Sequence, residues 1–161
     1  MKTKVTRHKR APRKFFGKEA YADFLIRKGY DEIGSGCYGV VVSKPGVKHV
    51  IKICDTYDNS GYLAFLRFAV RNQGNRFFPR IYSIEHFGDS FFVVKMEKLR
   101  PQKKIHERWE LLELLGSSRT KDARVALRVM NTLFWEHCPD IHCDNIMSRG
   151  RQLVIIDPVA E

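Results

Sequence analysis

The sequence is poor in cysteine, and its cysteines lack the paired spacing of a disulfide framework. The four of them, Cys37, Cys54, Cys138 and Cys143, are scattered through 161 residues. Scattered thiols in a chain of this size are typical of a reducing compartment. Hydrophobic residues make up 43% of the chain, which is enough for a packed core without disulfides. We therefore expect a cytoplasmic protein.

Long apolar runs are also missing. No stretch approaches the roughly 18 apolar residues that a membrane-spanning helix needs. No apolar run follows the basic start of the chain, which argues against a secretory signal. Internal repeats and low-complexity linkers are absent as well. We expect no membrane association and one domain, built as two small lobes that share a cleft.

Acidic residues are missing from the front of the chain. Residues 2–18 contain eight lysines and arginines and no acid, and the whole chain carries a net charge of +11. We expect residues 1–14 to form a flexible, solvated arm. The alternative is an arm that docks on an acidic protein surface or on the phosphates of a nucleic acid.

The first hundred residues read as a helix followed by a sheet. Residues 15–28 favour a helix that ends at Gly29. Five strands are predicted, two of them (38–42 and 49–53) from β-branched runs, with one helix between the third strand and the fourth. The strands are 30–33, 38–42, 49–53, 80–84 and 90–96, and the helix is 60–71, with Ser60 as a plausible cap.

The remainder favours helices and a hairpin. Residues 98–104 look like a connector, and two helices follow it. The second of these, residues 121–136, has apolar residues at three-and-four spacing and Thr120 as a cap. An irregular polar segment, 138–144, then leads into a hairpin of residues 145–148 and 152–157.

A glycine-rich motif covers residues 33–41, which read I-G-S-G-C-Y-G-V-V. The β-branched residues after Gly39 place it in a hairpin instead of at the start of a helix. Glycines in such a hairpin let backbone N–H groups approach phosphates closely. The alternative is an ordinary glycine-rich turn.

Lys52 lies between apolar residues in the predicted strand 49–53. An unpaired ammonium on a buried strand is costly, so a ligand or partner is expected. From the strand next to the glycine motif, this lysine could reach phosphate oxygens. The alternative is a lysine whose stem lies along a half-buried strand while its charge reaches water.

The strongest pattern is Asp140-x4-Asn145, with Asp157 twelve residues further on. The predicted hairpin brings Asn145 and Asp157 to the same end of adjacent strands. An amide and a carboxylate side by side suit Mg²⁺, which prefers oxygen ligands. Asp140, at the loop entrance, could accept the proton of an attacking hydroxyl. The alternative is a surface loop rich in capping residues.

A zinc site is a competing interpretation of the same region. His137, Cys138, His142 and Cys143 offer four ligands within seven residues. Structural zinc ligands usually come as two pairs with a long stretch between them, and adjacent His-Cys pairs strain a tetrahedral cage. The spacing therefore disfavours zinc.

These motifs, in this order, resemble the protein-kinase-like superfamily. The segments 140–147 and 156–159 are similar to the early serine/threonine protein kinases of T7-like phages, and the resemblance covers roughly residues 29–159. Minimal bacterial effector kinases and aminoglycoside-type phosphotransferases are also similar, and the latter place a histidine where His142 stands. The resemblance implies an α+β fold with a five-stranded antiparallel N-lobe sheet carrying one helix. It implies a truncated helical C-lobe with a catalytic loop and a β-hairpin.

The resemblance also implies boundaries and roles. A single domain would span residues 15–161, with 15–96 as the N-lobe and 97–161 as the hinge and reduced C-lobe. ATP and Mg²⁺ would be the cofactors, and host proteins the substrates. The catalytic residues would be Asp140 as base, Lys52 on the α- and β-phosphates, and His142 on the γ-phosphate or ordering the loop; Asn145 and Asp157 would hold Mg²⁺. Nucleotide contacts would come from Gly34, Ser35, Gly36 and Gly39 over the phosphates, from Ile33, Val41, Val50 and Met147 around adenine, and from Glu97 to Leu99 as the hinge.

The sequence departs from the kinase pattern in three ways. Residues 60–71 contain no acid to pair with Lys52, so Asp55, Asp58 or Asp157 would have to serve. Pro158 follows the metal-binding position and should stiffen that segment. The sequence ends at residue 161 with no activation loop, which leads us to expect constitutive or partner-gated activity. We also expect an uncovered face on the helix 121–136, used by a homodimer or a docked host protein.

Three other functions remain open. One is a catalytically weak or dead kinase-fold binder that inhibits a host protein, although it would not need all four polar residues of the motifs. Another is a small-molecule phosphotransferase. The last is a basic nucleic-acid-binding module, which would leave those residues unexplained.

Overall fold

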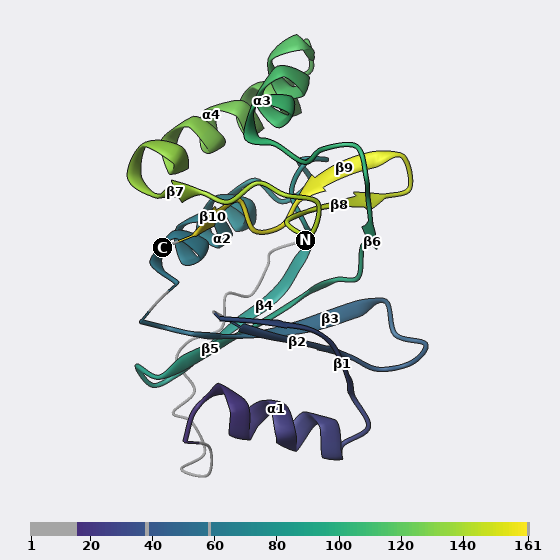
Figure 1. Ribbon diagram of the computed structural model, residues 1–161, viewed down its shortest axis with the longest axis vertical. Coiled ribbons are helices and arrows are strands. Elements are labelled where there is room, and N and C mark those ends of the chain that lie inside the picture. The colour runs from purple at the N-terminus through teal and green to yellow at the C-terminus, as the bar shows by residue number, and fades with distance from the viewer. Residues whose placement is uncertain (1–15, 38, 58, 161) are drawn as a thin grey trace. The chain divides into compact units, whose positions relative to one another are not determined.

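The computed structural model describes residues 16–37, 39–57 and 59–160 (Figure 1). The predicted arm, residues 1–14, lies outside them. The chain divides into two compact units. The first runs to Asn59 and takes in Ile81–Lys98, and the second holds Ser60–Arg80 and the chain from Leu99 onward. No helix in the described ranges is long and apolar enough to cross a membrane.

The first unit is built on a five-stranded antiparallel sheet, as the sequence predicts. Its strands lie in the order β1-β2-β3-β5-β4, so β3 is the central strand. They extend somewhat further than the β-branched runs alone indicate. Their bounds are β1 Asp31–Gly36, β2 Gly39–Ser43, β3 His49–Asp55, β4 Ile81–Phe87 and β5 Phe91–Glu97.

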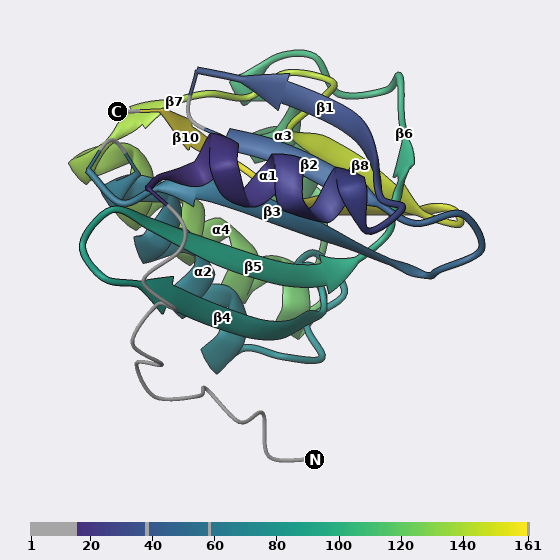
Figure 2. The same ribbon diagram turned by 90° about the horizontal axis from the view of Figure 1, so that it is seen from below.

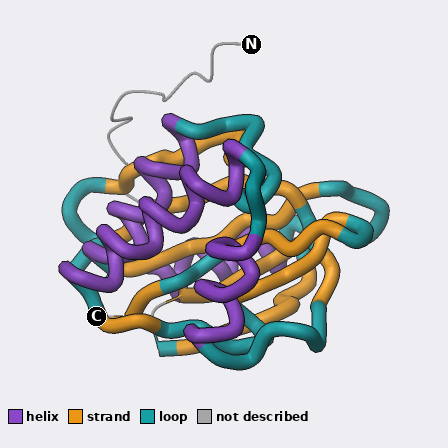
Figure 3. The backbone as a smooth tube through the Cα atoms, turned by 90° about the horizontal axis from the view of Figure 1, so that it is seen from above, coloured by secondary structure: helices purple, strands orange, loops and turns teal. Residues whose placement is uncertain are grey.

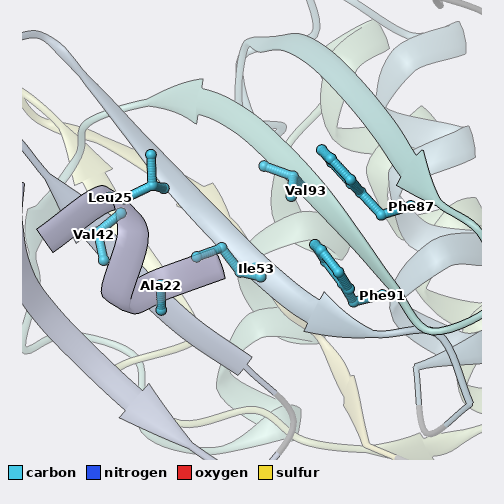
Figure 4. Close-up of a cluster of buried hydrophobic side chains, with 7 residues drawn as sticks. All are labelled: Ala22, Leu25, Val42, Ile53, Phe87, Phe91 and Val93. Atoms are coloured by element: carbon cyan, nitrogen blue, oxygen red, sulfur yellow. The ribbon is translucent and has the colours of Figure 1, made fainter. Parts of the chain in front are cut away.

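Helix α1 (Lys18–Arg27) lies across one face of this sheet (Figure 2). Its buried residues meet alternate residues of the strands in one apolar cluster, which Figure 4 shows. The cluster consists of Ala22, Leu25, Val42, Ile53, Phe87, Phe91 and Val93, with Ile51 packed against it. Because successive strand residues point to opposite faces, Val50 and Lys52 lie on the face that α1 does not cover.

Helix α1 is shorter than the predicted 15–28 but ends where the sequence indicates. Gly29 has a φ of 83°, and its N–H donates to the carbonyl of Ile26. A left-handed residue directly after a helix is the usual way to satisfy the last carbonyls, and glycine adopts it without strain. The chain can therefore turn at once into β1.

The second unit contains α2 (Ser60–Arg71), α3 (Arg108–Ser117) and α4 (Lys121–Glu136), drawn in purple in Figure 3 with α1. Helices α2 and α4 have the predicted bounds. The hydroxyl of Thr120 accepts a hydrogen bond from the N–H of Ala123 at 3.2 Å, which confirms the predicted cap. The buried stripe of α4 is Ala123, Ala126, Val129, Met130 and Leu133.

Two small sheets complete the second unit. One has the order β6-β8-β9, and the other pairs β7 with β10. The prediction of a plain connector at 98–104 is wrong in part, because two of its residues form β6 at the edge of the first small sheet, where a proline is tolerated. The strands are β6 Arg100–Pro101, β7 Cys138–Pro139, β8 Ile146–Arg149, β9 Gln152–Ile155 and β10 Val159–Ala160.

Helix α2 belongs to the second unit, whereas the sequence placed residues 60–71 in the N-lobe. The helix contacts α4 and β10. A Cβ atom at Gly61 would lie 2.9 Å from Val159 and 3.0 Å from the ring of His137, so its first turn packs directly on that unit. The boundary follows this packing and not the order of elements along the chain.

Candidate functional site

Two separate segments of the second unit place Asp140 next to Asp157. Strand β7 ends at Pro139, which pairs with Val159 of β10. The N–H of Asp140 then donates to the carbonyl of Pro158 at 2.9 Å. The backbone entering the polar loop therefore runs beside the backbone leaving the hairpin.

Asn145 links both segments. Its side-chain amide donates to the backbone carbonyl of Asp140 at 2.8 Å and to the Asp140 carboxylate at 3.0 Å. Its own carbonyl accepts from the N–H groups of Ile156 at 2.9 Å and Asp157 at 3.4 Å. The predicted adjacency of Asn145 and Asp157 is thus confirmed, and Asp140 joins them.

The donor set of this loop fits a magnesium ion. Both amide hydrogens of Asn145 are directed at Asp140, which leaves the amide oxygen available as a ligand. Asp157, whose backbone N–H donates to the carbonyl of Asn145, adds a carboxylate. Mg²⁺ prefers such oxygen ligands and uses few protein groups besides phosphates and water. The residues present therefore suit the ion that the sequence predicts.

His142 lies between two carboxylates of the same loop. Its Nε2 is 3.6 Å from Asp140 and its Nδ1 is 3.7 Å from Asp144. The N–H of Asp144 lies 3.3 Å from Nδ1, and the carbonyl of His142 accepts from the N–H groups of Asn145 and Ile146 at 3.0 and 3.2 Å. The residue orders the loop. Its predicted contact with the γ-phosphate stays a prediction.

The alternative zinc site is not assembled in the described part of the chain. The ligand atoms that lie within 4.8 Å of one another belong to His142, Cys143 and Asp144. His137 and Cys138, the other half of the proposed zinc set, are not in this group. His137 instead packs against Gly61.

The glycine-rich hairpin lies at the edge of the first unit, in β1 and β2. Gly34 and Gly36 are exposed, and a Cβ atom on either would meet nothing within 4 Å. At Gly39, by contrast, a Cβ would lie 2.9 Å from the carbonyl oxygen of Ile53. Packing on β3 therefore explains Gly39. The open space beside Gly34 and Gly36 is what a closely approaching ligand would require.

Lys52 occupies the centre of the sheet. It pairs with Val41 of β2 on one side and with Val94 of β5 on the other, and it is half-buried. Val41 and Val50 share its face of the sheet. The structure thus brings together the lysine and two of the residues predicted to contact adenine. Ile33, a third, lies at the bulge of β1 and is 51% exposed.

Asp55 is not available to Lys52 in the way the sequence suggested. Asp55 is three residues after Lys52 in β3, so its side chain lies on the opposite face of the sheet, the one that α1 covers. There its carboxylate accepts a hydrogen bond from Lys18. Asp58, another suggested partner, lies outside the described residues. Lys18 of α1 thus pairs with one of the acids that the sequence offered as a partner for Lys52.

The remaining predicted nucleotide contacts are the hinge residues, from Glu97 to Leu99, and Met147. Glu97 ends β5 and is buried, and the chain re-enters the second unit at Leu99. Met147 lies in β8, paired with Pro101 on one side and Val154 on the other. The hinge and adenine roles of these residues stay predictions.

Sequence reasoning missed Lys18, which it counted with the basic run. Its side chain donates to the carbonyl of Cys37 at 3.0 Å as well as to Asp55, and the residue is only 8% exposed. Burial by itself would lower the pKa of Lys18, but the hydrogen bond and charge of Asp55 raise it above its ordinary value. The ammonium therefore stays charged. No local pattern marks such a residue, because its partner lies 37 positions away.

Among the described residues, none covers the outward side of α4, which agrees with the face expected from the sequence. Trp135 is 90% exposed. It lines a shallow hollow of about 660 Å³ together with Arg124, Leu127, Arg128, Asn131, Thr132 and Glu136. Whether a second copy or a host protein covers it stays a prediction.

No family model and no curated protein matches the chain. Two solved structures that resemble it are protein kinase domains. The kinase PK-1 of the Cydia pomonella granulovirus matches with a TM-score of 0.43 at 15% identity, over 87% of this chain and 57% of that one. The kinase domain of BubR1 matches with a TM-score of 0.45 at 16% identity, over 79% of this chain and 44% of that one. The chain spans about half the length of these neighbours, and at this distance they do not show which of its residues act.

Proposed function

We propose that the chain is an ATP-dependent serine/threonine protein kinase that uses Mg²⁺ and modifies host proteins in the cytoplasm. The observation that supports this best is the linkage of Asp140, Asn145 and Asp157, which joins two segments of the second unit by hydrogen bonds. Asn145 donates two hydrogen bonds to Asp140, and its carbonyl accepts from the backbone of Asp157. A loop that served only to cap secondary structure would not need three such groups together.

The roles follow from the chemistry of the groups. The Asp140 carboxylate, half exposed beside its loop, would accept the proton of a serine or threonine hydroxyl as that oxygen bonds to the γ-phosphorus of ATP. The bond to the β-phosphate oxygen breaks, and ADP leaves. Asn145 would hold the Asp140 carboxylate in place. Asn145 and Asp157 would also hold Mg²⁺, which when bound would neutralise charge on the phosphates.

The first unit would supply the grip on the nucleotide. Lys52 places one positive charge on the sheet face that also carries Val41 and Val50. Such a charge could hold phosphate oxygens while the two valines contact the adenine. The exposed backbone at Gly34 and Gly36 could approach the phosphates without hindrance from side chains.

Transfer of labelled phosphate from ATP tests the proposal. The wild-type chain should label itself or proteins of a host lysate. Asp140→Asn keeps an oxygen that can accept from Asn145 but removes the base, so we expect transfer to fall by a factor of about 100 or more. Asp144→Asn is the matched control, because that carboxylate is 84% exposed in the same loop. It should retain most of the activity.

The outcomes separate the alternatives. No transfer by the wild type, with nucleotide still bound, would favour a kinase-fold binder or inhibitor. Transfer to an aminoglycoside, but to no protein, would favour a small-molecule phosphotransferase. Mapping of the phosphorylated residues would show whether serine, threonine or tyrosine is the acceptor.

A further inference from the structure

The first strand of the glycine hairpin, β1, has little burial to hold it in place. All six residues of β1 are exposed, and the strand pairs with β2 alone at the edge of the sheet. An edge strand without buried side chains depends on backbone pairing and on whatever contacts its end. A contact other than side-chain burial must therefore hold this strand in place.

Lys18 supplies such a contact from the first turn of α1. Its ammonium donates to the carbonyl of Cys37, one residue past the end of β1, at 3.0 Å. The same ammonium donates to the Asp55 carboxylate at the end of β3. One buried charge thus joins the turn of the hairpin, the central strand that carries Lys52, and the helix behind the sheet.

We propose that Lys18 is a positioning residue, which holds the glycine hairpin at the distance from β3 that nucleotide phosphates require. The inference rests on the proposed function and goes beyond it, because Lys18 touches neither nucleotide nor metal in that scheme. It also gives α1 a role in nucleotide affinity. A helix outside the ligand-binding face would then control that affinity through a single side chain.

The alternative is that Lys18 only stabilises the unit. The two roles differ in what they predict for ligand binding. If Lys18 merely stabilises, its removal lowers the melting temperature and leaves the nucleotide affinity of the folded chain unchanged. If it positions the hairpin, the affinity of the folded chain falls as well, because the phosphate-binding backbone must be ordered again for each binding event.

The decisive variant is Lys18→Met, which keeps the aliphatic stem and removes the charge. Hydrogen bonds made by charged groups contribute enough that we expect an ATP affinity about tenfold weaker. The KM for ATP should rise by a similar factor, while kcat changes less than threefold. Lys18→Arg should restore part of the affinity, because a guanidinium can still donate to both oxygens.

Lys28→Met, at the residue directly after the same helix, is the matched control. Its ammonium lies 5.7 Å from the centre of the Phe24 ring and is exposed at the other end of α1. It should leave ATP affinity and KM within twofold of the wild type. Both methionine variants are first compared by circular dichroism. If Lys18→Met does not fold, Lys18→Arg and Asp55→Asn take its place.

Amide hydrogen exchange of the nucleotide-free chain gives a reading that does not depend on the proposed function. Lys18→Met should speed exchange at residues 34–37, relative to Lys28→Met, and leave α1 protected. Faster exchange there together with weaker ATP binding supports the inference. Unchanged exchange, or unchanged affinity in a wild type that binds ATP, overturns it. A wild type that binds no ATP refutes the proposed function and the positioning role with it, and the exchange data then show whether Lys18 still orders the hairpin.

Discussion

Gly61 and His137 approach so closely that no side chain fits between them. A Cβ atom at Gly61 would lie 3.0 Å from the ring carbon Cγ of His137. On its other side it would lie 2.9 Å from a methyl group of Val159. Helix α2 therefore packs through its first turn on His137, directly before β7, and on Val159 of β10, and these two strands hold Asp140 beside Pro158.

This contact predicts that Gly61→Ala destabilises the chain. A methyl group must displace the His137 ring or Val159, and overpacking of this kind costs about 1–3 kcal/mol. That cost should exceed the gain of up to about 1 kcal/mol from replacing a helical glycine. Urea unfolding should therefore give a lower free energy of unfolding for the variant.

Gly116→Ala is the control for that measurement, because it makes the same change in another helix. Gly116 lies in α3, and a Cβ there would meet nothing within 4 Å. The propensity gain is then unopposed, and the free energy of unfolding should rise by up to about 1 kcal/mol. Equal effects of the two variants would show that the contact at Gly61 is loose.

The cap of α4 predicts a loss of stability on Thr120→Ala. The Thr120 hydroxyl accepts from the N–H of Ala123 at 3.2 Å, and the variant leaves that donor without it. We expect the free energy of unfolding to fall by about 1 kcal/mol. Thr132→Ala in the same helix is the control, because that exposed hydroxyl only donates to the carbonyl of Arg128. A hydroxyl used in this way adds little, so the control should be close to neutral.

The regular elements could be predicted because each has a repeat that shows in the sequence. Helix α4 repeats apolar residues at three-and-four spacing behind a threonine cap, and its bounds came out as predicted. Strands β2 and β3 are β-branched runs, and the antiparallel five-stranded sheet was expected too. Strand β1 was underestimated, because Gly34 and Gly36 carry no pattern even though they pair with β2.

The elements that were missed depend on partners far along the chain. Strand β6 contains Pro101 and exists because it pairs with β8, more than forty residues later. Strand β10 has two residues and pairs with β7. Lys18 looked like a member of a solvated basic run, and its burial depends on Asp55. The Asp140–Asn145–Asp157 linkage was predictable, because the spacing of the hairpin alone places the last two side by side.

Glu110 predicts a pH-dependent contribution to stability. Its carboxylate accepts from the N–H of His106 at 2.6 Å and of Glu107 at 2.9 Å, and these hydrogen bonds lower the pKa of Glu110 from its usual 4.5. A lowered folded-state pKa means that the contribution is present above the unfolded value of 4.5 and is lost as pH falls through the folded pKa. The wild type should therefore be more stable than Glu110→Gln at neutral pH, and the difference should shrink in acid.

Thermal unfolding of both proteins from about pH 6 to about pH 3 measures that difference. The glutamine keeps an acceptor oxygen but makes a weaker, uncharged hydrogen bond. Glu113→Gln is the control, since Glu113 is exposed on the same helix. Loss of this exposed carboxylate should change the free energy of unfolding little at neutral pH. A gap between wild type and Glu110→Gln that stays constant down to the lowest pH would contradict the assignment.

Asn145 predicts a link between loop geometry and metal dependence. Its amide holds Asp140 through bonds of 2.8 and 3.0 Å and leaves one oxygen for a metal ion. Asn145→Ala removes both functions, and we expect phosphate transfer to fall about 100-fold, since small misplacements of a reacting group cost that much. It should also abolish most of the effect of Mg²⁺ on nucleotide affinity, while the affinity measured with EDTA stays unchanged.

Asn145→Asp separates the two functions, because it keeps an oxygen ligand but cannot donate to Asp140. The variant should retain much of the Mg²⁺ effect on nucleotide affinity, measured by titration calorimetry, and still lose most of the transfer activity, because a second carboxylate beside Asp140 repels it. Asp144→Ala, in the same loop, should change neither quantity by more than about twofold, because an exposed carboxylate away from the linkage has little effect on either. If Asn145→Ala responded to Mg²⁺ as the wild type does, the metal ion would have to be held by residues other than the pair at the end of this hairpin.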